Sequence, residues 1–262
     1  MDDALAEMEF LARSGNRIAV LEAVSERPHT RSELAERTGA SQATLGRILR
    51  DFEERNWLAR TDGAYVATPT GNLVADGVLD LRKRLETERR LRPVVGMLPD
   101  ELDVDLRRLR TATLTTPTET RPSAPVTRSL DILREAGHIR AVSRALNDRT
   151  LRLLRRRAVA DGCTVDGVFA ARAIEALVDD DRLRPKLREL VAAESADIHV
   201  YEGPLSLAVT LADGTVSLLL RDDDGVVQAA LDTDDEAVAE WAASVHEQHR
   251  TAAEPLSPAD IV

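Results

Sequence analysis

Arg47 and Arg50 lie three positions apart and are the residues of this sequence best suited to bind an anionic partner. A guanidinium group carries a permanent charge and a fork of N–H donors, which match a phosphate group or the edge of a guanine. At 100° per residue, Ala43, Arg47 and Arg50 share one face of a helix. The small residues Ala43 and Gly46 would let a partner approach that face closely. The spacing therefore favours contact with the major groove of DNA.

The helix that carries these arginines needs a core against its opposite face. Leu45, Ile48, Leu49 and Phe52 supply that apolar stripe. Ser41 is expected to be the N-cap, and the helix is expected to run to about Asn56. In the preceding segment, RSELAERT, Thr30 and Glu33 have the spacing of a capping box, and Gly39 suits the left-handed end of a helix.

Two further elements complete the N-terminal pattern. The segment FLARSGNRIAVLEAVSERP, residues 10–28, has mostly helical spacing and is expected to form one helix closed by Pro28. The runs WLAR and YVAT flank Thr61-Asp62-Gly63, a strong hairpin signal. The order helix, helix, turn, helix and hairpin predicts a winged helix-turn-helix, with Arg60 placed to contact a phosphate or the minor groove. The alternative is a winged helix that docks on another protein.

The charge of the chain is unevenly distributed. Its 262 residues include 46 acidic and 35 basic ones, only Lys83 and Lys186 being lysines, and the formal net charge is −11. Residues 29–60 hold five acidic and six basic residues, so the expected DNA-contacting segment is not acidic. An acid-rich, lysine-poor surface is typical of proteins in molar salt and suggests a halophilic archaeal source.

Other sequence features indicate a cytoplasmic protein without a membrane partner. The single cysteine, Cys163, excludes an intrachain disulfide and favours a reducing compartment. The N-terminus MDDALAEMEF lacks the basic start and apolar run of a signal peptide. No apolar run is long enough to span a bilayer.

Residues 73–91, LVADGVLDLRKRLETERRL, are expected to form a helix. Its apolar stripe consists of Leu73, Val74, Val78, Leu81 and Leu85. The stripe indicates either a homodimer interface or packing on the first helix of the same chain. Another helix is expected in LPDELDVDLRRLR, residues 98–110, with proline in its first turn. TTPTETRPSAP, residues 115–125, is expected to be a loop or a surface strand.

Beyond residue 137, strand and helix patterns alternate. The expected strands are HIRAVS, TVDGVFA, IHVYEG, LSLAVTLADG, VSLLLRDDDG and VVQAALD. The expected helices are NDRTLRLLRRRAVADG, ARAIEALV, LRPKLRELVAAE and residues 234–253. This order predicts an α/β domain with a mixed sheet that ends in an antiparallel meander.

Several candidate sites in this second half also have a plainer interpretation. The arginines of LRLLRRR, residues 151–157, could bind an anionic effector or form the solvated face of a helix. His246 and His249 lack the cysteine or carboxylate partners of a zinc site, and neither acidic run, 179–181 or 222–224, has calcium-loop spacing. The tripeptides HIR at His138 and HVY at His199 lack the lysine of phospholipase D chemistry. No catalytic residue, metal or cofactor is therefore expected.

The N-terminal segments ARSGNRIAVLEAV, TRSELAERTGASQATLGRILRDFEERNWL and YVATPTG resemble archaeal transcriptional regulators of the ArsR-like winged-helix superfamily. The resemblance is closest to a haloarchaeal branch with a FilR-type middle domain, which commonly has Gly-Trp where this chain has Asn56-Trp57. The C-terminal half resembles the FilR-type effector domain in the order and spacing of its elements. The resemblance implies that Ser41, Gln42, Thr44, Arg47 and Arg50 face DNA.

These observations predict an α+β protein of three parts: a winged helix-turn-helix domain (residues 1–72), a connecting helix (73–92) and an α/β effector domain (93–262). The expected function is that of a homodimeric, sequence-specific, DNA-binding transcription regulator with a possible small-molecule effector. The residues expected to contact double-stranded DNA are Arg31, Ser41, Gln42, Ala43, Thr44, Gly46, Arg47, Arg50 and Arg60. The alternative of a protein-docking winged helix without a DNA target stays open.

Overall fold

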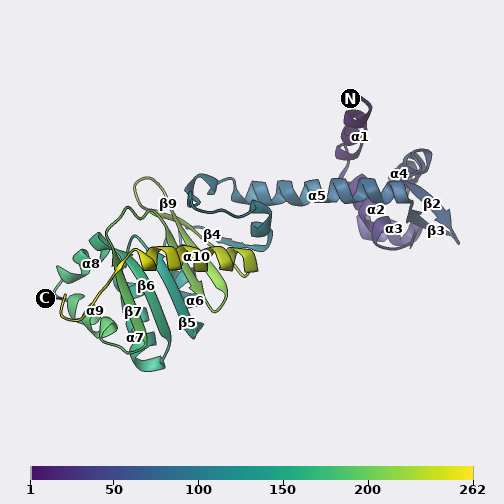
Figure 1. The fold of residues 1–262 in the computed structure, drawn as a ribbon. Coiled ribbons are helices and arrows are strands. Elements are labelled where there is room, and N and C mark those ends of the chain that lie inside the picture. Colours follow the sequence, from purple (N-terminus) through teal and green to yellow (C-terminus); the bar gives the residue numbers. More distant parts are fainter. Residues whose placement is uncertain (1, 262) are drawn as a thin grey trace. The chain divides into compact units, whose positions relative to one another are not determined.

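The computed structural model describes residues 2–261, and its internal contacts divide the chain into two units, Met1–Glu86 and Thr87–Val262 (Figure 1). The first unit has one apolar core, and the second has a core on each face of a large sheet. The predicted α+β fold class is confirmed. None of the described helices is long and apolar enough to cross a lipid bilayer.

The first unit begins with two helices, α1 (Asp2–Ala12) and α2 (Gly15–Glu26), where one was predicted. The helical conformation is interrupted at Ser14, whose backbone is extended. Because of this break, the ring of Phe10 lies between the guanidinium groups of Arg17 and Arg55, each 3.8 Å from its centroid. The same ring meets Phe52 edge-on at 6.1 Å. These contacts of Phe10 stabilise the structure more than continuing the helix through Ser14 would. The spacing of the apolar residues alone did not predict them.

The predicted winged helix-turn-helix is confirmed. It comprises α3 (Arg31–Thr38), α4 (Gln42–Glu54), β2 (Leu58–Thr61) and β3 (Ala64–Ala67). Thr30 and Glu33 form the capping box, and Gly39 ends α3 with φ +65°. Asp62 and Gly63 both have positive φ and close the hairpin. A short strand that was not predicted, β1 (His29–Thr30), pairs with β3 to give a sheet of order β1-β3-β2.

Two turns around Trp57 determine where the next helix starts. Asn56 has φ +57°, the left-handed conformation that glycine adopts most readily. The hydroxyl of Thr68 accepts a hydrogen bond from the Gly71 amide, and α5 (Pro69–Leu91) begins between them, four residues earlier than expected. A Cβ atom at Gly71 would collide with the carbonyl of Trp57, so only glycine fits this close approach.

The second unit is built on an eight-stranded sheet of order β11-β7-β6-β5-β8-β9-β10-β4. The strands are β4 (Thr113–Thr115), β5 (His138–Ser143), β6 (Thr164–Ala170), β7 (Ala196–Tyr201), β8 (Ala208–Ala212), β9 (Thr215–Arg221), β10 (Val227–Thr233) and β11 (Glu254–Pro255). Strands β5, β6 and β7 are parallel, and all other neighbours are antiparallel. The predicted mixed sheet with its antiparallel meander is thus present, with the two short edge strands β4 and β11 added.

Helices cover both faces of this sheet. One face packs against α6 (Ala124–Glu135), α7 (Asp148–Asp161), α8 (Ala171–Val178) and α9 (Arg184–Val191). The other packs against α10 (Glu236–Thr251), which lies across the strands in Figure 1. Buried strand residues alternate between the two cores, as a sheet covered on both faces requires: Ile139 and Val165 face α6–α9, and Val142 and Val168 face α10.

Two segments between residues 98 and 137 differ from their predictions. The expected helix over residues 98–110 is instead a turn followed by a short 3-10 helix, η2 (Leu106–Thr111), after a first one, η1 (Val95–Met97). The Asp105 carboxylate accepts a hydrogen bond from the Arg107 amide and delays the helix start. Helix α6 was not predicted at all, because Pro125 stands in its first turn rather than at a break.

Candidate functional site

Helix α4 presents the face that the sequence singled out. Its apolar stripe (Leu45, Ile48, Leu49 and Phe52) is buried in the core of the first unit. The side chains of Gln42, Ala43, Arg47 and Arg50 are exposed on the other side. Within residues 2–261, neither Arg47 nor Arg50 forms an ion pair or a hydrogen bond with another side chain. These two guanidinium groups are therefore free to bind an external partner.

The N-terminal end of α4 is already engaged in its own cap. The hydroxyl of Ser41 accepts a hydrogen bond from the Thr44 amide at 3.2 Å and contacts the Thr44 hydroxyl at 3.0 Å. Ser41 is exposed and Thr44 is half-buried. Both residues thus have a structural role besides the predicted one, and the O–H of Ser41 is already donated to Thr44.

Arg31 and Gly46 form a contact between α3 and α4. The guanidinium group of Arg31 donates a hydrogen bond of 2.7 Å to the carbonyl of Gln42. A Cβ atom at Gly46 would lie 2.8 Å from the Nη2 atom of Arg31. The absence of a side chain at Gly46 therefore makes room for Arg31 of the same chain, whereas the sequence suggested room for DNA.

Arg60 lies on the wing, apart from the helix residues. It is exposed on β2, and its guanidinium carbon is 5.8 Å from the centroid of the Tyr65 ring on the neighbouring strand. All nine predicted contact residues belong to the first unit, and each is either exposed or intermediate in exposure. The structure does not test DNA contact, which stays a prediction.

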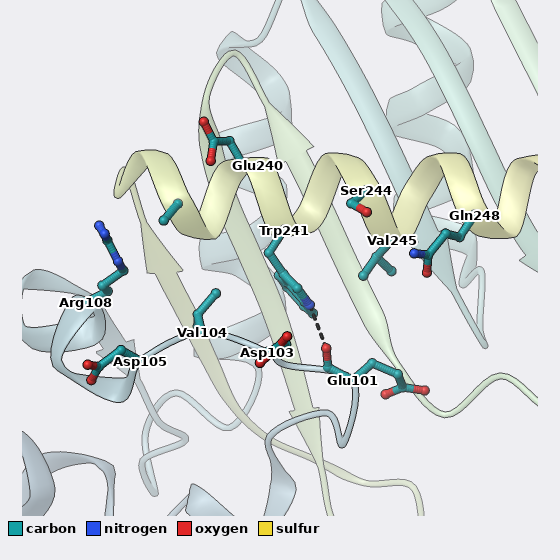
Figure 2. A pocket seen from close by; sticks show the side chains of 11 residues that line it. Glu101, Asp103, Val104, Asp105, Arg108, Glu240, Trp241, Ser244, Val245 and Gln248 are labelled. Atoms are coloured by element: carbon teal, nitrogen blue, oxygen red, sulfur yellow. Dashed lines mark hydrogen bonds between the residues drawn. The ribbon is translucent and has the colours of Figure 1, made fainter.

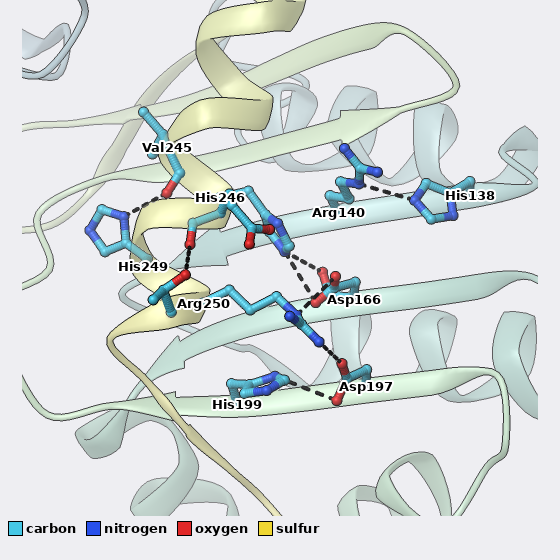
Figure 3. Close-up of polar contacts among 11 residues, drawn as sticks. His138, Arg140, Asp166, Asp197, His199, Val245, His246, His249 and Arg250 are labelled. Atoms are coloured by element: carbon cyan, nitrogen blue, oxygen red, sulfur yellow. Dashed lines mark hydrogen bonds and ion pairs between the residues drawn. The ribbon is translucent and has the colours of Figure 1, made fainter.

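A polar cluster that sequence reasoning missed lies in the second unit, between α10 and the parallel strands (Figure 3). Arg250 of α10 points between two carboxylates, with Nη2 2.6 Å from Asp197 and Nε 3.4 Å from Asp166. The buried side chain of His246 places Nε2 3.2 Å from Oδ1 of Asp166. His199 is also buried, and its Nδ1 lies 3.6 Å from Asp197.

The charges of this cluster determine the ionisation of Asp166. Burial raises the pKa of its carboxyl group, but its interactions with His246, Arg250 and His199 outweigh burial and lower that pKa overall. The pKa of Arg250 is raised, first by its hydrogen bond to Asp197 and then by the charge of Asp166. The ion pairs of Arg250 therefore fasten α10 to β6 and β7.

Asp166, Asp197 and His199 also have donor atoms within 4.8 Å of one another, a spacing that could hold a metal ion. The guanidinium group of Arg250 already lies against both carboxylates, so a metal would have to displace it. Its partners are 53 and 84 positions away in sequence, which explains why no local motif signalled the cluster. The one visible signal was a charged residue, Asp166, inside an otherwise apolar strand.

A cavity of about 560 Å³ lies between α10 and residues 101–108 (Figure 2). Trp241 projects into it from α10, and its indole N–H donates a 2.7 Å hydrogen bond to the carbonyl of Glu101. Its acidic lining residues are Glu101, Asp103, Asp105 and Glu240, and its basic one is Arg108. This excess of carboxylates disfavours an anionic ligand in this cavity.

Two protein-family models match the chain, one in each half. Residues 5–90 match the model of the HVO_A0261 N-terminal domain. Residues 122–252, half of the chain, match the model of the middle domain of the methanogenesis regulatory protein FilR1. The chain belongs to the FilR1 middle-domain family. The FilR1 match spans α6 to α10 and so contains the polar cluster, and the FilR-type resemblance of the C-terminal half is confirmed. Membership of the ArsR-like superfamily stays a prediction.

Solved structures resemble the chain only loosely. The structure described as TrmBL2, an archaeal chromatin protein, is 14% identical with a TM-score of 0.42, and the alignment covers 92% of each chain. The phospholipase D family member Nuc from Salmonella typhimurium is 13% identical with a TM-score of 0.45, over 56% of this chain and 99% of that one. No curated protein matches the chain.

Proposed function

We propose that this chain is a DNA-binding transcription regulator that works as a homodimer, with its α/β domain as the regulatory part. The observation that carries the proposal is the exposed face of α4, where Arg47 and Arg50 lie opposite a buried apolar stripe. A helix fixed by its inner face and carrying unpaired arginines on its outer face suits the major groove of DNA. Family membership supports the regulatory role, because FilR1 is itself a regulatory protein. We propose that the DNA-binding part comprises residues 1–72, the connecting helix residues 73–92 and the regulatory part residues 93–262.

The two arginines have different proposed roles. Arg47 is nearer the N-terminal end of α4, where side chains of recognition helices reach base edges. Arg50 lies almost one turn further on, where a recognition helix leaves the groove, and it is proposed to contact a phosphate. Gln42 and Ala43, exposed in the first turn of the same helix, complete the base-contacting face, and Arg60 of the wing contacts the backbone.

The role proposed for Arg31 follows from its contact with α4. Its guanidinium group is anchored to the Gln42 carbonyl, so it adds positive charge beside the recognition helix without being free to move along the groove. Ser41 and Thr44 hold the helix start in place, and the Thr44 hydroxyl, which accepts the Ser41 O–H, has its own O–H left to donate to the nearest phosphate. Gly46 leaves the space beside α4 that the guanidinium group of Arg31 occupies.

Exposed apolar side chains support dimerisation through the first unit. On α5, Leu73, Leu81 and Leu85 are 73%, 41% and 56% exposed. Val74 and Val78, which the sequence assigned to the same stripe, pack instead against the core of the first unit. The two valines of the stripe therefore pack within the chain, and its three leucines remain exposed. The exposed leucines are proposed to contact the same leucines of a second copy.

The proposal is tested by measuring duplex affinity against salt concentration for the wild-type chain, Arg47→Ala and Arg50→Ala, on operator and on scrambled DNA. Arg47→Ala is expected to cost about 1–3 kcal/mol on operator DNA and to relax the preference at one base pair. Arg50→Ala is expected to weaken binding to both duplexes alike and to lower the salt slope by about one.

Arg13→Ala is the matched control, because it removes the same charge from an exposed turn of the same unit, where Arg13 pairs with Glu9 alone among the described residues. It is expected to leave both affinities unchanged. If neither Arg47→Ala nor Arg50→Ala alters affinity while both proteins stay folded, α4 does not read DNA. The protein-docking alternative then replaces the proposal.

A further inference from the structure

A groove of about 400 Å³ lies between α6 and α7, on the helical side of the sheet. It is lined by Thr127, Leu130, Arg134, Arg149, Arg152, Leu153 and Arg156. Four of these residues are arginines, and none is acidic. This contrasts with the domain as a whole, in which residues 91–262 hold 30 acidic and 21 basic residues.

The arginines of α7 divide into two groups by what they contact. Arg155 pairs with Glu189 of α9, and Arg157 pairs with Asp161 and donates to the carbonyl of Ala136. These two arginines fasten α7 to its neighbours. Arg149, Arg152 and Arg156 recur at intervals of three and four residues, so they share the face that lines the groove.

Two of the four groove arginines retain an unneutralised charge. Arg134 pairs with Asp131 and Arg152 with Asp148, in each case within one helix. Among the described residues, Arg149 and Arg156 form neither an ion pair nor a hydrogen bond with any side chain. Two guanidinium groups on one helix face without a counter-charge make that face positive, and an anion bound between them would neutralise it.

We propose that this groove binds a small, multiply charged anion, a compound that carries phosphate groups or several carboxylates. Arg149 and Arg156 would each donate paired N–H groups to an anionic group, and the hydroxyl of Thr127 adds a further donor. Leu130 and Leu153 give the groove an apolar component that suits the carbon skeleton of a metabolite. A volume of this size matches a small ligand, whereas a DNA backbone needs an extended track.

The regulatory meaning of this site rests on the proposed function, but binding itself does not. Calorimetric titration of the full chain with pyrophosphate and, separately, with citrate is expected to show saturable binding at one site per chain for at least one of them. Binding of pyrophosphate would indicate a ligand with phosphate groups, and binding of citrate would indicate a ligand with carboxylates. The double variant Arg149→Ala/Arg156→Ala is expected to lose at least tenfold in affinity, while its thermal unfolding stays that of the wild type, because both side chains are exposed.

Two further variants sharpen the test. Arg149→Lys/Arg156→Lys keeps the charges but loses the paired donors, so intermediate affinity is expected. Arg172→Ala on α8 removes an exposed arginine outside the groove and is expected to change nothing. Saturable binding that persists in Arg47→Ala would uphold the site even if the DNA-binding proposal fails.

The inference is overturned if neither anion binds saturably, or if Arg172→Ala weakens binding as much as the groove variants do. It is equally overturned if the groove variants leave anion binding intact but abolish binding of non-specific duplex DNA, which would make the groove a backbone contact.

Discussion

Asn56 is a residue whose backbone conformation sets its tolerance to change. It holds φ +57° between α4 and β2, and its carbonyl accepts hydrogen bonds from the hydroxyls of Thr68 and Thr70. Asn56→Ala is expected to lower the free energy of unfolding by about 1 kcal/mol, because alanine tolerates left-handed backbone poorly. Asn56→Gly is expected to change stability little, because glycine adopts the left-handed backbone without strain. Urea unfolding of both variants tests this, and equal losses would contradict it.

The ion pair between Arg250 and Asp166 leads to a prediction about the stability of the fold at acidic pH. The pKa of Asp166 is lower in the folded chain than in the unfolded one, so its ionised carboxylate stabilises the fold. This stabilisation is complete at a pH above the pKa of the unfolded chain and is lost as the pH falls through the pKa of the folded chain. Arg250→Met is expected to reduce stability at neutral pH by about 1 kcal/mol, since Arg250 is partly exposed, and to move the onset of acid unfolding to higher pH.

Circular dichroism against pH measures both effects. Arg172→Met is the control for charge loss, because Arg172 is exposed and lies outside the cluster. An unchanged acid limb for Arg250→Met would show that Arg250 does not hold the Asp166 carboxylate in its ionised form.

At the scale of the element, α5 carries the prediction about assembly. Leu81→Glu/Leu85→Glu is expected to convert dimers into monomers in light scattering, because the charges would face each other across an apolar contact. Val78 is unsuited to this test, since it belongs to the core of its own unit. The control is Val159→Glu/Val226→Glu, two valines that are 55% and 56% exposed in the second unit. An unchanged mass for the α5 variant would place the interface elsewhere.

Elements with a local chemical signal were predictable from the sequence, and elements without one were not. The capping box of Thr30 and Glu33 and the turn at Asp62 and Gly63 act within a few residues, so the winged helix-turn-helix and its exposed face could be predicted. The break at Ser14 could not, because it depends on rings and guanidinium groups brought together by folding.

The same distinction applies to the candidate sites. The face of α4 is a property of one helix, and helical spacing suffices to find it. The cluster around Asp166 joins two strands to a helix that follows 80 positions later, so its members share no sequence pattern. The Arg31–Gly46 contact was missed for a similar reason, since it crosses from one helix to the next.

For the whole molecule, the net charge of −11 leads to a prediction about salt. Raising KCl from about 0.1 M to about 2 M is expected to raise the melting temperature, because it screens the repulsion among the excess carboxylates. The exposed ion pairs oppose this trend only weakly, since each contributes little. Thermal unfolding across the salt series tests this, and a melting temperature that falls steadily with KCl would contradict the halophilic interpretation.

The contact between Arg31 and Gly46 couples one position of α3 to one position of α4. A Cβ atom at position 46 would displace the flexible end of the Arg31 side chain, so the substitution would cost the hydrogen bond from Arg31 to the Gln42 carbonyl rather than the fold. Once Arg31 is replaced by a smaller residue, that cost no longer arises. The effect of a change at either position therefore depends on which residue occupies the other.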